Sequence, residues 1–357
     1  MFPVSFARQM IATYSKPGET VVDPFCGRGT SLYVAKALGR ESFGCELNPV
    51  GWIYAKTKVD PARRPERLRQ RIRQLYENAL PDDWEAENDF QEWAFSPDVL
   101  AFINSCRRSL NWKESKIDRT VAAFLLVYLH GKAGGAMSNQ MRQSKSMAPD
   151  YAVRWWKENK KRPPELDPVK YLTERIAWRY QKGLWQKDVR ATVFLGDCRS
   201  NLRRYRGARA NLVLTSPPYM GITNYEYDNW IRLWALGGPS LPSWKLAQRY
   251  ANRERFKSLM SQAFMKAREV CTNKPVVVVR TDSRRFTLEC TAESVRDAWP
   301  KHVLYAKRTV AQKPTQTALF GDGAKKPGEV DLIALPRERR QPSGFINLLE
   351  VCESDDE

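Results

Sequence analysis

Residues 20–31 read Thr-Val-Val-Asp-Pro-Phe-Cys-Gly-Arg-Gly-Thr-Ser, and this stretch decides the fold. The β-branched run predicts a strand, the Gly-x-Gly segment predicts a turn, and residues 31–38 follow a helical pattern that closes at Gly39. The next predicted strand, residues 42–45, ends in Glu46, where a carboxylate can accept both hydroxyls of a ribose. A strand, a glycine loop and a helix in this order are typical of α/β proteins that hold nucleotide-type cofactors.

The glycine loop differs from the two common phosphate-binding loops. It lacks the third glycine of a dinucleotide fingerprint and the Gly-Lys-Ser/Thr of a P-loop, so no grip on a pyrophosphate is indicated. A Gly-x-Gly alone is more often a structural turn than a site. Glu46, together with Asp23, whose carboxylate can face an ammonium group, makes a site for an adenosyl amino acid an equal alternative.

A second informative stretch, residues 211–219, reads Asn-Leu-Val-Leu-Thr-Ser-Pro-Pro-Tyr. Its apolar run predicts a strand, which the two prolines end because they lack amide donors and fix φ. The result is a rigid loop that offers carbonyls, the Ser216 hydroxyl and the Tyr219 ring. These groups suit a planar partner that carries an amino donor, such as a nucleobase. A strand-terminating turn with a packing tyrosine is the alternative.

The two stretches together resemble a known enzyme family. Residues 23–31 are similar to the DPF-x-G-x-G-T motif of amino-methyltransferases that act on DNA bases, and residues 215–219 are similar to their catalytic loop, in the TSPPY form associated with N4-cytosine methylation. Residues 2–19 resemble the family's helix over the methionine end of the cofactor, and residues 193–197 resemble the strand whose acidic residue meets the adenine amino group. The resemblance covers roughly residues 1–55 and 190–335 and does not extend to residues 60–190.

The resemblance implies S-adenosylmethionine as the cofactor and a seven-stranded, Rossmann-like class I methyltransferase sheet with a mainly helical insertion. The cofactor-binding residues that it implies are Asp23, Phe25, Gly27, Gly29, Thr30, Glu46 and Asp197. The catalytic residues that it implies are Ser216, Pro217, Pro218 and Tyr219. Asp197 can also be read more simply, as the cap of the helix that follows it.

The expected reaction is methylation of an exocyclic amine, at N4 of cytosine first and at N6 of adenine second. Acceptors from Ser216 and the Pro217-Pro218 carbonyls would hold the amino hydrogens, and Tyr219 would stack against a base flipped out of the duplex. One rival is an RNA base-amine methyltransferase, because some of these enzymes carry a similar DPFCG loop. A non-enzymatic rival is a DNA-binding subunit that keeps the fold but not turnover.

The composition favours double-stranded DNA as the partner. The chain has 59 Lys and Arg against 40 Asp and Glu, a formal net charge of +19, which points to a polyanion. Seven cysteines without a C-x-x-C pair indicate reduced thiols, and no apolar run reaches membrane-spanning length, so we expect a cytoplasmic protein without a membrane partner. With only two histidines we expect no metal site. A cognate restriction endonuclease is a possible partner.

The predicted organisation is a discontinuous catalytic domain, residues 1–60 and 191–340, a helical insertion, residues 61–190, and a C-terminal tail, residues 341–357. The acidic end of this tail, residues 353–357, is expected to be disordered. The insertion is basic and is the candidate target-recognition region, led by the glycine-hinged loop of residues 131–147. The DNA-binding residues predicted there are Asn139, Gln140, Arg142, Lys145, Lys160 and Lys161. A flexible surface loop without contact to DNA is the alternative for residues 131–147.

Overall fold

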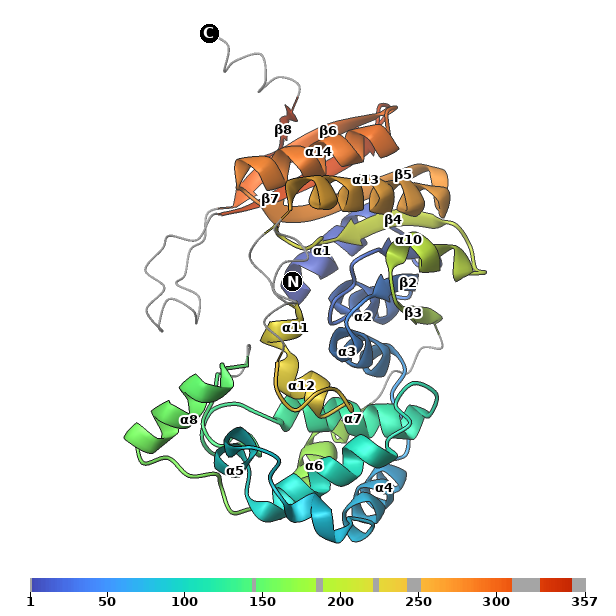
Figure 1. Cartoon of the computed structure of the whole chain (residues 1–357). Helices are drawn as coiled ribbons and strands as arrows, with labels where there is room; N and C mark the ends of the chain where they lie inside the picture. Colours follow the sequence, from blue (N-terminus) through green and yellow to red (C-terminus); the bar gives the residue numbers. More distant parts are fainter. Residues whose placement is uncertain are drawn as a thin grey trace. The chain divides into compact units, whose positions relative to one another are not determined.

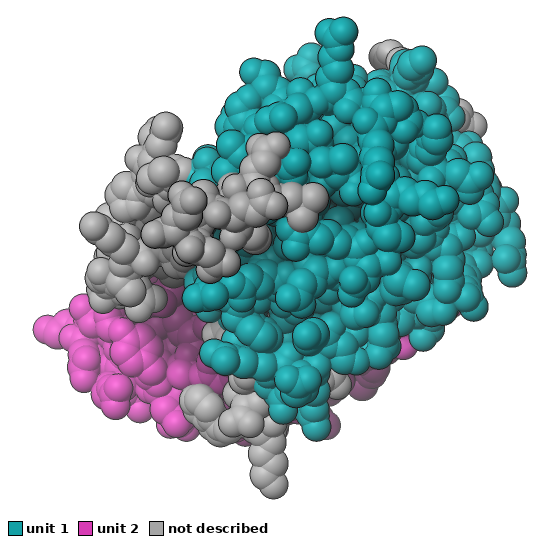
Figure 2. All heavy atoms as spheres, turned by 90° about the horizontal axis from the view of Figure 1, so that it is seen from above, with its two compact units in different colours: residues 1–47, 187–223, 250–357 teal, residues 48–186, 224–249 magenta. Residues whose placement is uncertain are grey.

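A computed structural model describes residues 2–142, 146–183, 189–220, 225–242, 252–309 and 328–348 of the chain (Figure 1). The chain divides into two compact units, which Figure 2 shows in different colours. Unit 1 comprises residues 1–47, 187–223 and 250–357, and unit 2 comprises residues 48–186 and 224–249. The acidic end of the predicted tail, residues 353–357, lies outside the described residues.

Unit 1 is built on one mixed sheet. Its strands are β1 (Thr20–Asp23), β2 (Glu41–Glu46), β3 (Ala191–Leu195), β4 (Ala210–Thr215), β5 (Cys271–Asp282), β6 (His302–Thr309), β7 (Glu329–Pro336) and β8 (Ile346–Asn347). They lie in the order β3-β2-β1-β4-β5-β7-β6-β8, and β7 runs antiparallel to both of its neighbours. The predicted Rossmann-like class I methyltransferase fold is thereby confirmed. The two-residue β8, which pairs with β6, was not predicted.

Helices cover both faces of this sheet. Helices α1 (Val4–Tyr14) and α2 (Thr30–Ala37) pack on one face, and α10 (Cys198–Asn201), α13 (Arg253–Glu269) and α14 (Arg285–Ala298) pack on the other. Neighbouring strand residues alternate between the two cores, so that Val21 faces the first and Val22 the second. A sheet covered on both sides needs apolar residues at every position, which explains the uninterrupted run at residues 276–279.

Unit 2 is helical in its described part. Its elements are α3 (Pro49–Val59), α4 (Pro65–Glu77), η1 (Pro81–Trp84), α5 (Asp89–Ala94), α6 (Pro97–Ser109), α7 (Lys116–Tyr128), α8 (Pro149–Glu158), α9 (Pro168–Tyr180), α11 (Tyr225–Asp228) and α12 (Trp230–Trp234), while the short η2 (Leu202–Arg204) belongs to unit 1. Five of the α-helices begin at a proline, because its fixed φ suits the first helical position, whose amide needs no partner within the helix.

Unit 2 includes α3 and residues 224–249, which the sequence analysis places in the catalytic domain. The packing explains the difference. The Trp52 ring of α3 meets Trp112 edge-on, with ring centroids 6.1 Å apart, and Trp230 of α12 meets Phe90 of α5 at 4.7 Å. These aromatic contacts lie within unit 2 and are invisible in a linear pattern.

Among the described helices, none combines the length and the apolar character needed to cross a membrane.

Candidate functional site

The glycine loop that follows β1 has a backbone that only glycine adopts easily. Gly27 and Gly29 have φ angles of 53° and 73°, in the left-handed region. Gly29 is the N-cap of α2 and supplies no side-chain cap, so the first amides of the helix are presented at the loop. The loop is tied to β2, because the amide of Cys26 donates to the carbonyl of Cys45 at 3.0 Å.

Gly44, on β2, allows β1 and β2 to approach closely. A Cβ atom at this position would lie 2.4 Å from the carbonyl oxygen of Asp23, so any side chain would push the glycine loop away. Two features of the sequence therefore shape the loop, its own glycines and a glycine on the next strand. The second was not identified from the sequence.

The structure places Asp23 differently from the prediction. Its side chain is buried, and its oxygens accept hydrogen bonds from the backbone of Phe25 at 3.1 Å and from the hydroxyls of Ser31 and Thr215, the latter at 2.6 Å. Burial raises the pKa of this carboxyl to about 6, although the bonds from Ser31 and Thr215 act in the opposite direction. Asp23 thus braces the glycine loop, α2 and the end of β4 together, and nothing indicates that its carboxylate faces an ammonium group.

Glu46 and Asp197 lie at the carboxyl ends of neighbouring strands. Glu46 is partly buried at the end of β2, and its carbonyl accepts the amide of Gly196, directly before Asp197, at 2.9 Å. Asp197 caps α10 through the amide of Arg199 at 2.8 Å and pairs with the guanidinium group of the same residue, which lowers the pKa of the carboxyl. The capping reading is therefore correct. The side chain remains 29% exposed, which leaves room for contact with a ligand.

The predicted catalytic loop follows β4 at the same edge of the sheet. Pro217 and Pro218 are buried, whereas Ser216 and Tyr219 are partly buried. Burial raises the pKa of Tyr219 to about 12. The nearby Ser216 hydroxyl lowers that pKa in part, but the buried Tyr219 hydroxyl makes no well-formed hydrogen bond within the described part of the chain.

The two predicted loops lie on adjacent strands. β1 and β4 pair in parallel, with Val22 opposite Val213, so their carboxyl ends meet at one edge. The hydrogen bond from Thr215 to Asp23 joins the two loops directly. Ser31 and Thr215, which complete this junction, were not predicted as site residues. They are ordinary polar residues in the sequence, and only the strand order reveals their contact.

In unit 2, the loop of residues 131–142 is packed rather than free. Ala136, Met137, Ser138, Asn139 and Met141 are buried, and Gly131 forms a β-bridge with Gln140. The Asn139 side chain is spent on the backbone, because it donates to the carbonyl of Trp93 at 2.9 Å and accepts the amide of Gln140 at 2.8 Å. The structure therefore corrects the base-reading role predicted for Asn139.

The other predicted DNA-binding residues differ in exposure where the structure describes them. Gln140 and Arg142 are partly buried, Lys160 and Lys161 are exposed, and Lys145 lies outside the described residues. Close to the two lysines, Trp93 has the Arg162 guanidinium 4.0 Å and the Lys157 ammonium 5.3 Å from its ring centroid. This surface of unit 2 combines exposed cations with an aromatic face.

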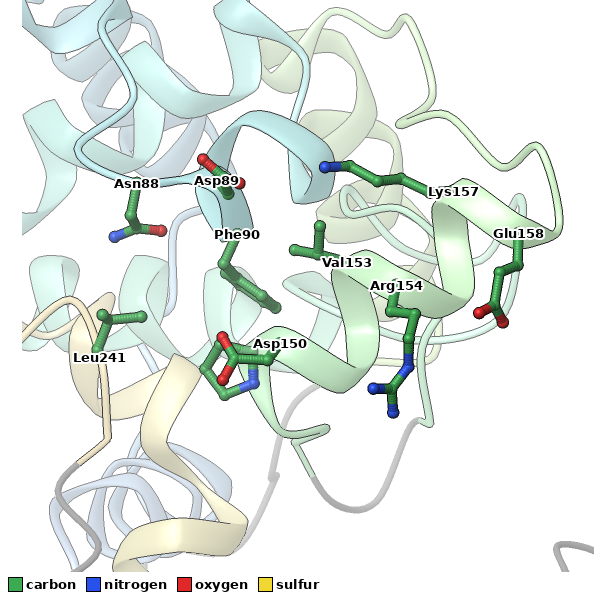
Figure 3. A pocket seen from close by; sticks show the side chains of 10 residues that line it. Asn88, Asp89, Phe90, Asp150, Val153, Arg154, Lys157, Glu158 and Leu241 are labelled. Carbon is green, nitrogen blue, oxygen red and sulfur yellow. The ribbon is translucent and has the colours of Figure 1, made fainter.

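Unit 2 also carries an open hollow of about 410 Å³ between α5 and α8 (Figure 3). Figure 3 shows Phe90 and Val153 on its apolar wall, with Asp150, Arg154 and Lys157 around them. Its lining mixes both signs of charge and includes no residue predicted for the cofactor or for catalysis. We assign it no chemistry. Among the described residues, no three His, Cys, Asp or Glu side chains gather as metal ligands would.

Comparisons with known proteins match a part of the chain. A family model described as DNA methylase matches residues 1–51, which contain α1, the glycine loop and Glu46. The type II methyltransferase M.SmaI of Serratia marcescens is 41% identical over 59 residues, which are 16% of this chain and 20% of the relative. The chain thus matches about a fifth of the length of that curated relative.

Solved structures of low similarity were also found. The rRNA methyltransferase aviRa from Streptomyces viridochromogenes has a TM-score of 0.34 and 12% identity, with 94% of this chain and 85% of the other covered. A TehB-like SAM-dependent methyltransferase from Corynebacterium glutamicum has a TM-score of 0.36 and 8% identity, with 93% and 87% covered. The fold assignment rests on the strand order of the sheet and not on these scores.

The matched family and the fold both imply S-adenosylmethionine as the cofactor, and the residues present fit it. The uncapped first turn of α2 offers amides to a carboxylate, with Phe25, Gly27, Gly29 and Thr30 around it. Glu46, at the end of the next strand, suits the ribose hydroxyls, and Asp197 suits the adenine amino group.

Proposed function

We propose that the chain is an S-adenosylmethionine-dependent DNA methyltransferase that acts on the exocyclic N4 amine of cytosine. One observation carries the proposal. The glycine loop and the Ser-Pro-Pro-Tyr loop follow paired parallel strands and are joined by the hydrogen bond from Thr215 to Asp23. A cofactor held by the first loop and a base held by the second would therefore meet at one edge of the sheet.

The residues of the second loop suit the chemistry of an aromatic amine, whose nitrogen lone pair is delocalised into the ring. In this proposal, the Ser216 hydroxyl and a carbonyl of Pro217 or Pro218 accept the two amino hydrogens and so direct the lone pair at the methyl group. A nitrogen–carbon bond forms, the sulfur–carbon bond breaks and one amino proton leaves to solvent. The bound cofactor supplies an electrophilic sulfonium methyl. Proximity and fixed acceptors account for the rate.

The DNA substrate is proposed from the matched methylase family and from the charge of +19. The helical insertion, residues 61–190, is proposed as the target-recognition region. Lys160 and Lys161 would contact phosphates, and Gln140 and Arg142 would reach base edges. Trp178 on α9 is 48% exposed, with the cations of Arg179 and Lys182 5.1 and 4.6 Å from its ring centroid, and adds a second basic aromatic face.

The six cysteines among the described residues are free and buried, which supports a cytoplasmic setting for the activity. A partner restriction endonuclease is part of the proposal. N6 of adenine is the second choice of target, since Ser before Pro-Pro favours cytosine without deciding the base.

Transfer of a labelled methyl group to duplex DNA, to single-stranded DNA and to RNA tests the substrate class. We expect label in DNA from the wild type and none from Ser216→Ala. Label in RNA alone would overturn the DNA assignment, and cofactor binding without transfer to any of the three would favour a non-enzymatic subunit.

A further inference from the structure

The carboxyl end of β5 carries an acidic residue, Asp282, whose side chain is only 3% exposed. Both the backbone amide and the guanidinium group of Arg284 donate hydrogen bonds to this carboxylate. The Arg284 amide donates to Oδ1 at 3.1 Å, and its guanidinium donates to Oδ2 from Nε at 2.9 Å and from Nη2 at 2.5 Å. A buried carboxylate is costly unless it is paired and hydrogen bonded, so the two side chains form one fixed unit.

The same guanidinium group reaches the predicted catalytic loop. Nη2 of Arg284 donates to the carbonyl of Met220 at 2.7 Å, and Met220 directly follows Tyr219. Pro217 and Pro218 have no backbone N–H with which to anchor the loop themselves. The loop is therefore held from outside at both ends, by Thr215 on Asp23 before the prolines and by Arg284 after them.

A second ion pair lies two residues earlier, on the same face of β5. Arg280 forms a bidentate pair with Asp331, with Nε to Oδ1 at 2.6 Å and Nη2 to Oδ2 at 2.9 Å, and its guanidinium lies 3.7 Å from the Phe6 ring centroid. Burial is the main cause of the raised pKa of Tyr219; the charges of Glu329 and Asp282 raise it further, and the charge of Arg280 lowers it. Tyr219 thus lies in the field of the Arg280 guanidinium and of the Glu329 and Asp282 carboxylates.

We propose that Arg284, held by Asp282, is a positioning residue for the methyl transfer. The inference rests on the function proposed above. Arg284 fixes the Met220 carbonyl, and through it the placement of Ser216 and Tyr219, without touching the base or the cofactor. The role needs an arginine, because a planar fork can grip a carboxylate and reach a carbonyl at once, whereas an ammonium group is a point charge on a flexible stem.

Kinetics of Arg284→Ala and Arg284→Lys test the proposal, with Arg285→Ala as the matched control. Arg285 is the next residue, is 91% exposed, and pairs at the surface with Glu289. We expect kcat to fall about 10²-fold in Arg284→Ala, the scale on which a small misplacement of reacting groups acts. Arg284→Lys should recover kcat only in part. The calorimetric affinity for S-adenosylmethionine should be unchanged in all three variants.

Hydrogen exchange at the amides of Tyr219 and Met220 gives a second readout, which does not depend on activity. Exchange should be faster in Arg284→Ala and unchanged in Arg285→Ala. Unchanged exchange with unchanged kcat would overturn the positioning role, and so would a loss of cofactor affinity that matched the loss of turnover. Should Arg284→Ala fail to fold, Arg284→Lys carries the same test. Failure of the proposed function itself would appear in the wild type, as no methyl transfer to DNA.

Discussion

Two glycine-containing loops of this protein look alike in sequence and differ in the structure. Residues 24–30 join β1 to α2, and their shape is fixed by left-handed glycines and by the close approach of Gly44. Residues 131–142 bury most of their central side chains within unit 2 and close through a bridge of Gly131 to Gln140. The first loop exposes backbone amides of α2 at the end of a strand. In the second loop, the side-chain amide of Asn139 is hydrogen bonded to the protein's own backbone.

The difference shows that glycine content alone does not make a binding loop. The first loop follows a strand at the carboxyl edge of a parallel sheet, where neighbouring strand ends bring further polar groups together. The second joins two helices, and nothing in the local pattern says which side chains turn inward. Position in the topology places the first loop beside other strand ends, and packing decides the conformation of the second.

The largest effect on methyl transfer is expected at the Ser-Pro-Pro-Tyr loop after β4, which lies at the same edge of the sheet as the first glycine loop. Ser216→Ala and Tyr219→Ala should lose about 10²–10³-fold in methyl transfer, the scale for removing a group that acts on the reacting centre. Cofactor affinity should not change. Tyr219→Phe should keep most activity, because the hydroxyl is buried without a well-formed hydrogen bond in the described chain and the ring does the stacking. Full activity of Tyr219→Ala on duplex DNA would contradict that role.

Asp23 allows a pH test of the burial of its carboxyl beneath the first loop. Its pKa is raised from 3.8 to about 6, so the stability it contributes is present below about pH 4 and is lost as the pH rises to about 6. Asp23→Asn keeps an acceptor for Phe25 and Thr215 and serves as the reference. Relative to this variant, the free energy of unfolding of the wild type should fall by at most about 3 kcal/mol over this pH interval. Denaturant unfolding at a series of pH values measures it, and parallel curves would contradict the raised pKa of Asp23.

Glu46→Ala tests the cofactor contact proposed for the end of β2, beside the first loop. The loss of one or two charge-assisted hydrogen bonds, each about 1.5–3 kcal/mol, should weaken S-adenosylmethionine binding at least about tenfold. Glu41→Ala is the control, because Glu41 lies at the opposite end of the same strand and bonds the Tyr205 hydroxyl. Equal affinities for S-adenosylmethionine in the wild type and Glu46→Ala, measured by calorimetry, would contradict the predicted contact with the ribose.

The smallest effects are expected in the second loop, where one substitution should change stability and its neighbour should change the target sequence. Asn139→Ala should lower stability by about 1–3 kcal/mol, because it leaves buried backbone groups without partners, and should leave the methylated DNA motif unchanged. Gln140→Ala should instead relax that motif, at about 1–3 kcal/mol for a lost base contact. Sequencing of methylated DNA separates the two. A changed methylated motif in Asn139→Ala would instead support the base-reading role predicted for Asn139 from the sequence.

Much of unit 1 was predictable from the sequence, because strand ends, glycines and prolines mark it locally. The contacts that join the site were not predictable. Asp23 reaches Thr215 across 192 positions, and Arg284 reaches Met220 across 64, so only the strand order brings them together. The same limit explains the misreading of Asn139, whose partner Trp93 lies 46 residues away. Patterns of neighbouring residues carry no information about such pairs.

Mass spectrometry of hydrolysed product DNA tests the central claim most directly. Duplex DNA incubated with the full chain and S-adenosylmethionine, and the same DNA incubated with Ser216→Ala, are digested to nucleosides and compared. We predict N4-methylcytosine in the wild-type sample and its absence from the variant sample. N6-methyladenine alone would reverse the choice of base, and the absence of any methylated nucleoside in the wild-type sample would contradict the proposed function.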